Sequence, residues 1–158
     1  MRSPLLSTVL LASCITGASA QVDHARNDVN PFIGTGGHGH TFPGACVPNG
    51  LVQLSPDTRA DGMMDWDGCG GYHYSDSVIH GFSHTHLSGT GVADLCDVLL
   101  MPMDHNPDPK EFTGTTNPWS SHFSHTNESA HAGYYRVHLD GPDVEAELTA
   151  TQRAGVHR

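Results

Sequence analysis

The chain has few basic residues, and this scarcity excludes a first group of functions. Its 158 residues include 7 Lys and Arg against 17 Asp and Glu, which gives a formal net charge of −10 with neutral histidines. Sequence-independent binding to nucleic acid or to an anionic lipid surface depends on clustered Lys and Arg. The basic residues are scattered here, so we expect no nucleic-acid partner.

Long apolar runs are absent beyond the first twenty residues, so no later stretch reaches the ~18 apolar residues of a membrane span. Residues 1–20 place one cation, Arg2, before an apolar run and the small residues 18–20 (ASA), the layout of a secretory signal peptide. We expect cleavage before Gln21 and an exported protein, periplasmic or extracellular. An alternative interprets residues 11–14 (LASC) as a bacterial lipobox, with Cys14 lipidated and anchored to a membrane.

Cysteine is also sparse, which limits the number of disulfides and argues against a structural zinc site. After residue 20 the chain has Cys46, Cys69 and Cys96, and this odd number permits at most one internal disulfide. No C-x-x-C pair occurs, so the spacing does not predict a structural zinc site. The G-x-S-x-G elbow of a serine hydrolase is missing too, so the motifs indicate no serine nucleophile.

Helical periodicity is scarce, and short β-type runs bounded by turn residues take its place. Gly, Pro, Asn and Asp at the boundaries supply the backbone angles that turns require. This pattern predicts an all-β fold, an antiparallel β-sandwich. The expected strands lie in residues 50–56, 77–87, 97–103, 133–140 and 144–158.

The run at residues 133–140 shows the strand pattern most clearly. Tyr135, Val137 and Leu139 alternate with polar residues, which predicts one buried and one solvated face. Residues 105–132 contain three prolines and are expected to form a long surface loop with a turn of helix at most. The last run continues to Arg158 without a cap or polar tail, so we expect the sandwich to be incomplete at its C-terminal end.

Histidine is abundant and partly paired. His38 and His40, like His84 and His86, are two residues apart, so an extended backbone would place each pair on one face. Two such pairs could supply four zinc or copper ligands. The alternative is that they are hydrogen-bonding residues at the rim of a polar pocket.

Trp66 and the aspartates are the remaining candidates for binding chemistry. Trp66 fits either a buried sandwich position or an exposed platform for a sugar ring. Glycosidic chemistry would need two carboxylates at a defined separation, but turn capping explains most aspartates of this kind. Spacing alone singles out no pair among Asp57, Asp61, Asp65, Asp67, Asp76, Asp94 and Asp97.

Four ordered motifs resemble the N-terminal region of glycoside hydrolase family 92, the exo-acting α-mannosidases. They are VNPFIGTGGHGHTFPGACVPNGLVQLSPDTR, GYHYSDSVIHGFSHTHLSGTGVADLCDVLLMP, AGYYRVHLD and AELTATQRAGVHR, and together they run from Val29 to Arg158. The resemblance implies an N-terminal β-sandwich packed against a larger C-terminal (α/α)6 domain, with the active site between them. It also implies calcium-dependent, inverting hydrolysis of terminal α-mannosides from N-glycans or mannans.

What this resemblance implies for individual residues is limited, because the family's acid, base and calcium ligands belong chiefly to the C-terminal domain. We therefore expect no catalytic residue in residues 21–158 and no calcium bound by this chain alone. The motifs instead imply a polar wall for a mannose-terminated glycan. Its expected residues are Trp66, Asp67, His84, His86, Gly91 and Asp94. Some α-1,2-specific relatives carry a bulky aromatic residue where this chain has Gly91, so the linkage preference stays open.

Three hypotheses follow. The first is the sugar-facing N-terminal part of a secreted α-mannosidase, inactive without the catalytic domain. The second is a stand-alone carbohydrate-binding module, and the third is a metal protein based on the paired histidines.

Overall fold

The computed structural model describes residues 26–59, 66–111 and 117–158. The signal-peptide and lipobox interpretations concern residues 1–20 and lie outside the described residues, as do Asp61 and Asp65. Within these ranges there are nine strands and two short 3-10 turns, and every strand pairing is antiparallel. The all-β antiparallel prediction is therefore confirmed. No helix in this part of the chain has the length and apolar content needed to cross a bilayer.

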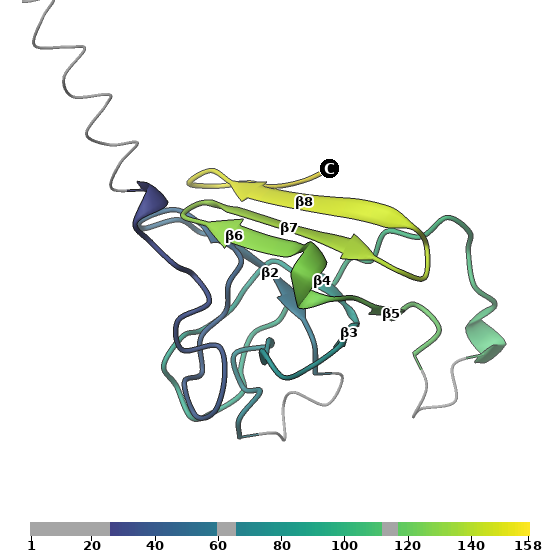
Figure 1. Cartoon of the computed structure of the whole chain (residues 1–158), viewed down its shortest axis with the longest axis horizontal. Coiled ribbons are helices and arrows are strands. Elements are labelled where there is room, and N and C mark those ends of the chain that lie inside the picture. The colour runs from purple at the N-terminus through teal and green to yellow at the C-terminus, as the bar shows by residue number, and fades with distance from the viewer. Residues whose placement is uncertain (1–25, 60–65, 112–116) are drawn as a thin grey trace, which may run out of the picture.

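Two sheets form the layers of the molecule (Figure 1). The larger sheet contains, in chain order, β6 (Glu128–His131), β7 (Tyr134–Leu139), β8 (Val144–Ala150) and β9 (Gly155–His157). The smaller sheet has the order β1 (Ala45–Cys46), β2 (Gln53–Asp57) and β4 (Gly81–Ser83). A separate pair joins β3 (Val78–Ile79) to β5 (Ser121–His122), and the 3-10 turns are η1 (Pro109–Glu111) and η2 (His125–Asn127).

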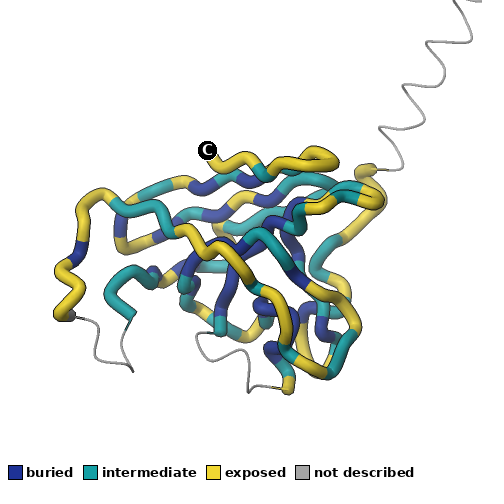
Figure 2. Tube along the Cα trace, turned by 180° about the vertical axis from the view of Figure 1, so that it is seen from behind, coloured by how far each residue is buried: buried dark blue, intermediate teal, exposed yellow. Residues whose placement is uncertain are grey.

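The hydrophobic core lies between the two layers, and Figure 2 shows buried stretches on the strands of both. Tyr135, Val137 and Leu139 on β7 are 0% exposed, so the predicted alternation of this strand is confirmed. Leu54 on β2 and Phe82 on β4 meet them from the smaller sheet. Two sheets can exclude water from one shared interior only if each strand turns every second side chain inward.

A single carboxylate accepts hydrogen bonds at the edge of this core. The side chain of Glu128 is 1% exposed, and it accepts bonds from the hydroxyls of Tyr72 and Tyr135 and from Nδ1 of His125. Burial, together with the charge of Glu128, raises the pKa of both tyrosines well above its ordinary value. Through Tyr72, these bonds join the loop that follows β2 to β6 and β7.

The structure corrects three element predictions. Residues 105–132 are not one long loop, because β5, η2 and β6 occupy their second half, and β6 pairs with β7 through a tight turn in which Gly133 has a φ of 78°. The predicted strand at 77–87 is split in two at His80, which separates β3 from β4, and it ends at Ser83. The run at 97–103 has only an isolated bridge from Leu100 to Phe82.

Candidate functional site

Three glycine-rich loops, residues 34–41, 66–71 and 86–91, meet on one side of the smaller sheet. The backbone N–H of Gly89 donates to the carbonyl of His40 at 2.7 Å, and the thiol of Cys69 donates to the carbonyl of Thr90 at 2.9 Å. Gly70 packs directly on the backbone of His40. The motifs that are separate in the sequence therefore build one surface.

Trp66 is the most prominent side chain of this surface, and 59% of it is exposed. The imidazole of His40 contacts the indole ring edge-on, with ring centroids 5.0 Å apart and an interplanar angle of 85°. Gly91 lies against the same ring, since a methyl group at this position would come within 2.3 Å of the indole Cη2 atom. The structure thus places Trp66 as an exposed aromatic plane rather than as a core residue.

Polar groups stand beside this plane. Nδ1 of His38 donates to the carboxylate of Asp67, whose side chain is 41% exposed. Nε2 of His40 is buried and has no hydrogen-bond partner. We call the group of Trp66, Asp67, His38, His40 and Gly91 the Trp66 surface. The paired histidines at 38 and 40 therefore serve this surface, a role that their spacing alone did not distinguish from metal binding.

His86 lies inside the molecule, not at the rim of the Trp66 surface. Its side chain is 0% exposed, Nδ1 lies 2.7 Å from the carbonyl of Gln53, and Nε2 lies 3.0 Å from Oδ1 of Asp57. Ser83 Oγ also lies near Nε2, at 3.1 Å. In a catalytic triad the serine and the carboxylate contact opposite ring nitrogens. Here both contact Nε2, so these residues do not form a serine-hydrolase triad.

Cys96 joins Asp57 and His86 from a partly exposed position. Burial and the neighbouring charge of Asp57 raise the pKa of the Cys96 thiol to about 12, so it is protonated at neutral pH. Among the described residues, the metal-capable group of three or more side chains is Asp57, His86 and Cys96, with ligand atoms all within 4.8 Å of one another. We call this group the Asp57 cluster. It offers one carboxylate, one imidazole and one thiol, and this donor set does not suit calcium, which takes six to eight oxygen ligands.

Gly71 connects the Asp57 cluster to the Trp66 surface. It ends the loop at residues 66–71 with a φ of +88°, and a methyl group here would lie 2.5 Å from Oδ1 of Asp57 and 2.9 Å from Cδ2 of His86. The backbone of the surface loop therefore lies directly against the buried pair.

Two predicted site residues have other surroundings. Nδ1 of His84 lies 2.7 Å from the carbonyl of Val98, and its Nε2 lies 3.2 Å from Nε2 of His157 on β9. Burial and this neighbouring imidazole lower the pKa of His157. Asp94 is exposed and accepts a hydrogen bond from the backbone N–H of Leu95. Of the six predicted residues, Trp66, Asp67 and Gly91 thus come together in one surface.

The metal site predicted from the two histidine pairs is not formed in the described residues. His38 and His84 have the separate partners given above, and neither belongs to a group of three potential ligands. The prediction that each histidine pair lies on one face assumed an extended backbone. The backbone is not extended at His40, where φ is +55°, and β4 ends at Ser83, before His84.

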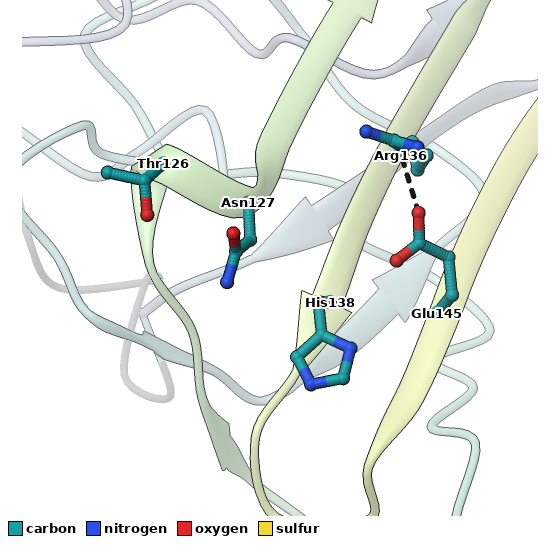
Figure 3. Close-up of a pocket in the computed structure, with 5 residues that line it drawn as sticks. All are labelled: Thr126, Asn127, Arg136, His138 and Glu145. Carbon is teal, nitrogen blue, oxygen red and sulfur yellow. Dashed lines mark ion pairs between the residues drawn. The ribbon is translucent and has the colours of Figure 1, made fainter.

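A concave region, separate from the Trp66 surface, lies on the outer face of the larger sheet (Figure 3). It is a shallow hollow of about 360 Å³ lined by Thr126, Asn127, Arg136, His138 and Glu145. Arg136 Nε and Glu145 Oε1 are 3.0 Å apart, and both side chains are nearly half exposed. The hollow is lined by polar side chains and has no Trp or Tyr in its lining, whereas the Trp66 surface combines an exposed indole with polar groups, so the Trp66 surface is the better candidate site.

Comparisons with known proteins identify the family of this chain. Residues 28–158 match the glycosyl hydrolase family 92 N-terminal domain. An uncharacterised secreted glycosidase of Arthroderma benhamiae is 29% identical over 159 residues, covering 99% of this chain and 20% of the relative.

Solved structures give the same relationship. The family 92 α-mannosidase BT3965 of Bacteroides thetaiotaomicron is 40% identical with a TM-score of 0.73, and covers 82% of this chain and 17% of that one. BT3965 is also known in complex with mannoimidazole. The inverting mannosidase BT2199 of the same species is 27% identical with a TM-score of 0.55, over 82% of this chain and 17% of that one. The chain thus spans about a fifth of the length of these relatives.

The match to the family over residues 28–158 and the shared sandwich lead to one conclusion: the chain belongs to glycoside hydrolase family 92, in which these residues correspond to the N-terminal domain.

Proposed function

We propose that the chain is the sugar-binding N-terminal part of an exported exo-α-mannosidase, and that the Trp66 surface holds the terminal mannose of an N-glycan or mannan. The single observation that carries this proposal is the exposed indole of Trp66, set on Gly91 and bordered by polar groups. An aromatic plane suits the apolar face of a pyranose ring, and the adjacent carboxylate and imidazoles suit its hydroxyls.

The chemistry of bond cleavage belongs to another part of the enzyme in this proposal. An inverting glycosidase needs an acid that protonates the leaving oxygen and a separate base that activates water. Asp67 is engaged by His38, and Asp57 is buried, so we assign neither residue these roles. The acid, the base and a calcium ion would be supplied by the (α/α)6 domain, and this chain would be inactive alone. The mannosidase relatives and their greater length support this division.

Export is part of the proposal as well. The signal-like segment at residues 1–20 and the secreted relative both support it.

The test is a binding titration with methyl α-mannoside. Trp119→Phe leaves Trp66 as the single tryptophan, so fluorescence then reports on the proposed site. We expect a saturable change with a Kd of roughly 1–10 mM, the weak affinity of one monosaccharide on an open surface. Methyl α-galactoside serves as the stereochemical control. Calorimetry on Trp66→Ala should show no binding.

A saturable signal for mannoside that Trp66→Ala abolishes would support the proposal. Equal binding by Trp66→Ala and the unchanged chain would place any sugar site elsewhere, for example at the hollow on the larger sheet. A lack of saturable binding up to tens of millimolar would contradict a binding role for this chain.

A further inference from the structure

The Asp57 cluster brings together three potential metal ligands from three segments of the chain. Asp57 ends β2, His86 follows β4, and Cys96 lies in the segment that runs beside β4. One donor atom of each residue lies within 4.8 Å of the other two. We propose that the Asp57 cluster binds a zinc ion. This inference is independent of the mannoside proposal.

The orientation of His86 is that of a metal ligand. Its Nδ1 lies 2.7 Å from the carbonyl of Gln53, an acceptor, so Nδ1 carries a proton and Nε2 is directed at the cluster. Metal-binding histidines use this arrangement, in which a second hydrogen bond fixes the tautomer and the ring position. Asp57 is held in a similar way, because its Oδ2 accepts from the backbone N–H of Ser83 at 2.9 Å. Its Oδ1 is left beside Nε2.

The electrostatics of the cluster also favour a cation. With a proton on Nδ1, a neutral His86 presents the Nε2 lone pair to Oδ1 of Asp57 at 3.0 Å, and two lone pairs at this distance repel each other. A proton or a metal ion between them would remove this repulsion, and the Ser83 hydroxyl, 3.1 Å from Nε2, is the neutral alternative donor to that lone pair. Both side chains are almost fully buried, at 0% and 7% exposed, so water cannot readily screen this repulsion.

Zinc matches the donor set and the charge. One imidazole, one thiolate and one carboxylate are ligands that zinc accepts, whereas magnesium and calcium favour oxygen donors alone. A thiolate on Cys96 and the carboxylate of Asp57 carry two negative charges, which a divalent ion neutralises. Binding would form bonds from zinc to Nε2, Sγ and Oδ1 and would release the thiol proton of Cys96 to solvent. The fourth position would hold a water molecule.

The spacing needs only a small adjustment. Ligands of a tetrahedral zinc ion lie roughly 3.3–3.8 Å apart, given bond lengths of about 2.0–2.3 Å. The pair of Nε2 and Oδ1 is already near this separation at 3.0 Å. Cys96 is partly exposed and lies in a chain segment without regular strand structure, so its thiol is the donor that can move.

The decisive variant is Cys96→Gly. Cys96 has a φ of +59°, a conformation that glycine adopts at low cost, so this change removes the thiolate without straining the fold. Cys46→Ser is the matched control because Cys46 is an exposed free cysteine outside the cluster. The intact protein, its Cys96→Gly variant and its Cys46→Ser variant would each be purified with a chelator and titrated with zinc chloride. Cobalt(II) chloride would serve as a spectroscopic probe.

We expect one zinc ion per chain and a rise in Tm of roughly 5–10 °C at a free zinc concentration of 100 times Kd. Cobalt(II) should give the absorption of a tetrahedral site together with a thiolate charge-transfer band. Cys46→Ser should behave like the unchanged protein. Cys96→Gly should keep its metal-free Tm, lose the charge-transfer band and bind zinc at least 100-fold more weakly.

Two results would overturn the proposal. One is the absence of a zinc-dependent Tm shift in the unchanged protein, which would leave a proton between His86 and Asp57, or the Ser83 hydroxyl, to satisfy the Nε2 lone pair. The other is zinc binding by Cys96→Gly as tight as that of the unchanged protein, which would place the ion elsewhere.

Discussion

Replacing Gly71 by alanine should destabilise the fold far more than the same change at another glycine of positive φ. Gly71 has a φ of +88°, and an added methyl group would lie 2.5 Å from Oδ1 of Asp57 and 2.9 Å from Cδ2 of His86. Gly89 has a φ of +76°, but no heavy atom lies within 4 Å of a methyl group placed there. The two sites therefore share the backbone cost and differ in packing.

The magnitudes follow from these distances. Holding alanine at positive φ costs about 1 kcal/mol at either position. At Gly71 the methyl group also collides with a buried pair whose members are fixed by other bonds, Asp57 by the N–H of Ser83 and His86 by the carbonyl of Gln53. Separating a buried pair of this kind costs about 3 kcal/mol or more. We therefore expect a loss of about 4 kcal/mol for Gly71→Ala and about 1 kcal/mol for Gly89→Ala.

The assay is equilibrium unfolding in urea, followed by far-UV circular dichroism, in buffer that contains a chelator so that metal does not contribute. The free energy of unfolding is obtained for the unchanged protein and for the two variants under identical conditions. Equal losses for Gly71→Ala and Gly89→Ala would refute the reasoning, because they would mean that the buried pair yields to a methyl group at no cost.

Two further predictions concern the buried tyrosines and the exposed tryptophan. Because burial and Glu128 raise the pKa of Tyr135 in the folded state, this residue contributes stability that is fully present below pH 10, the ordinary tyrosine pKa, and is lost as the pH rises further. Urea unfolding from pH 8 to 11 should show this decline in the free energy of unfolding. Tyr135→Phe should make the decline shallower without abolishing it, because Tyr72 also has a raised pKa. An unchanged slope in Tyr135→Phe would contradict the role given to Tyr135. Gly91→Ala should push Trp66 off its position, since the methyl group would lie 2.3 Å from the ring. We expect mannoside affinity to fall about 10-fold while the free energy of unfolding changes by less than about 1 kcal/mol, because an exposed ring can move aside; unchanged affinity would show that the ring position does not matter for binding.

Local patterns were sufficient to predict the fold class and the clearest strand. Alternation at Tyr135, Val137 and Leu139 fixed the buried face of β7, because side chains alternate with period 2 whatever the strand pairs with. The second half of the segment at 105–132 was wrongly predicted as loop. Its strands β5 and β6 are short, and each exists through pairing: β5 with β3, which lies far away in the sequence, and β6 with β7, the next strand across a tight turn.

The candidate site was predictable only in part, because some of its residues come together only in the folded chain. The sequence alone indicated Trp66, Asp67 and Gly91 through the family resemblance, and it identified the histidine pairs as unusual. It did not show that His86 would turn inward to Asp57, or that Cys96 would join them, because these residues lie 29 and 39 positions from Asp57 along the chain.

Composition and periodicity thus determined that the chain is an acidic, antiparallel β protein, and its ordered motifs added the resemblance to a glycosidase family, since all of these depend on neighbours in sequence. Only the tertiary structure decided which polar residues face solvent and which face each other. That outcome depends on where glycine lets distant loops approach, as Gly71 does for the Asp57 cluster and Gly91 does for Trp66.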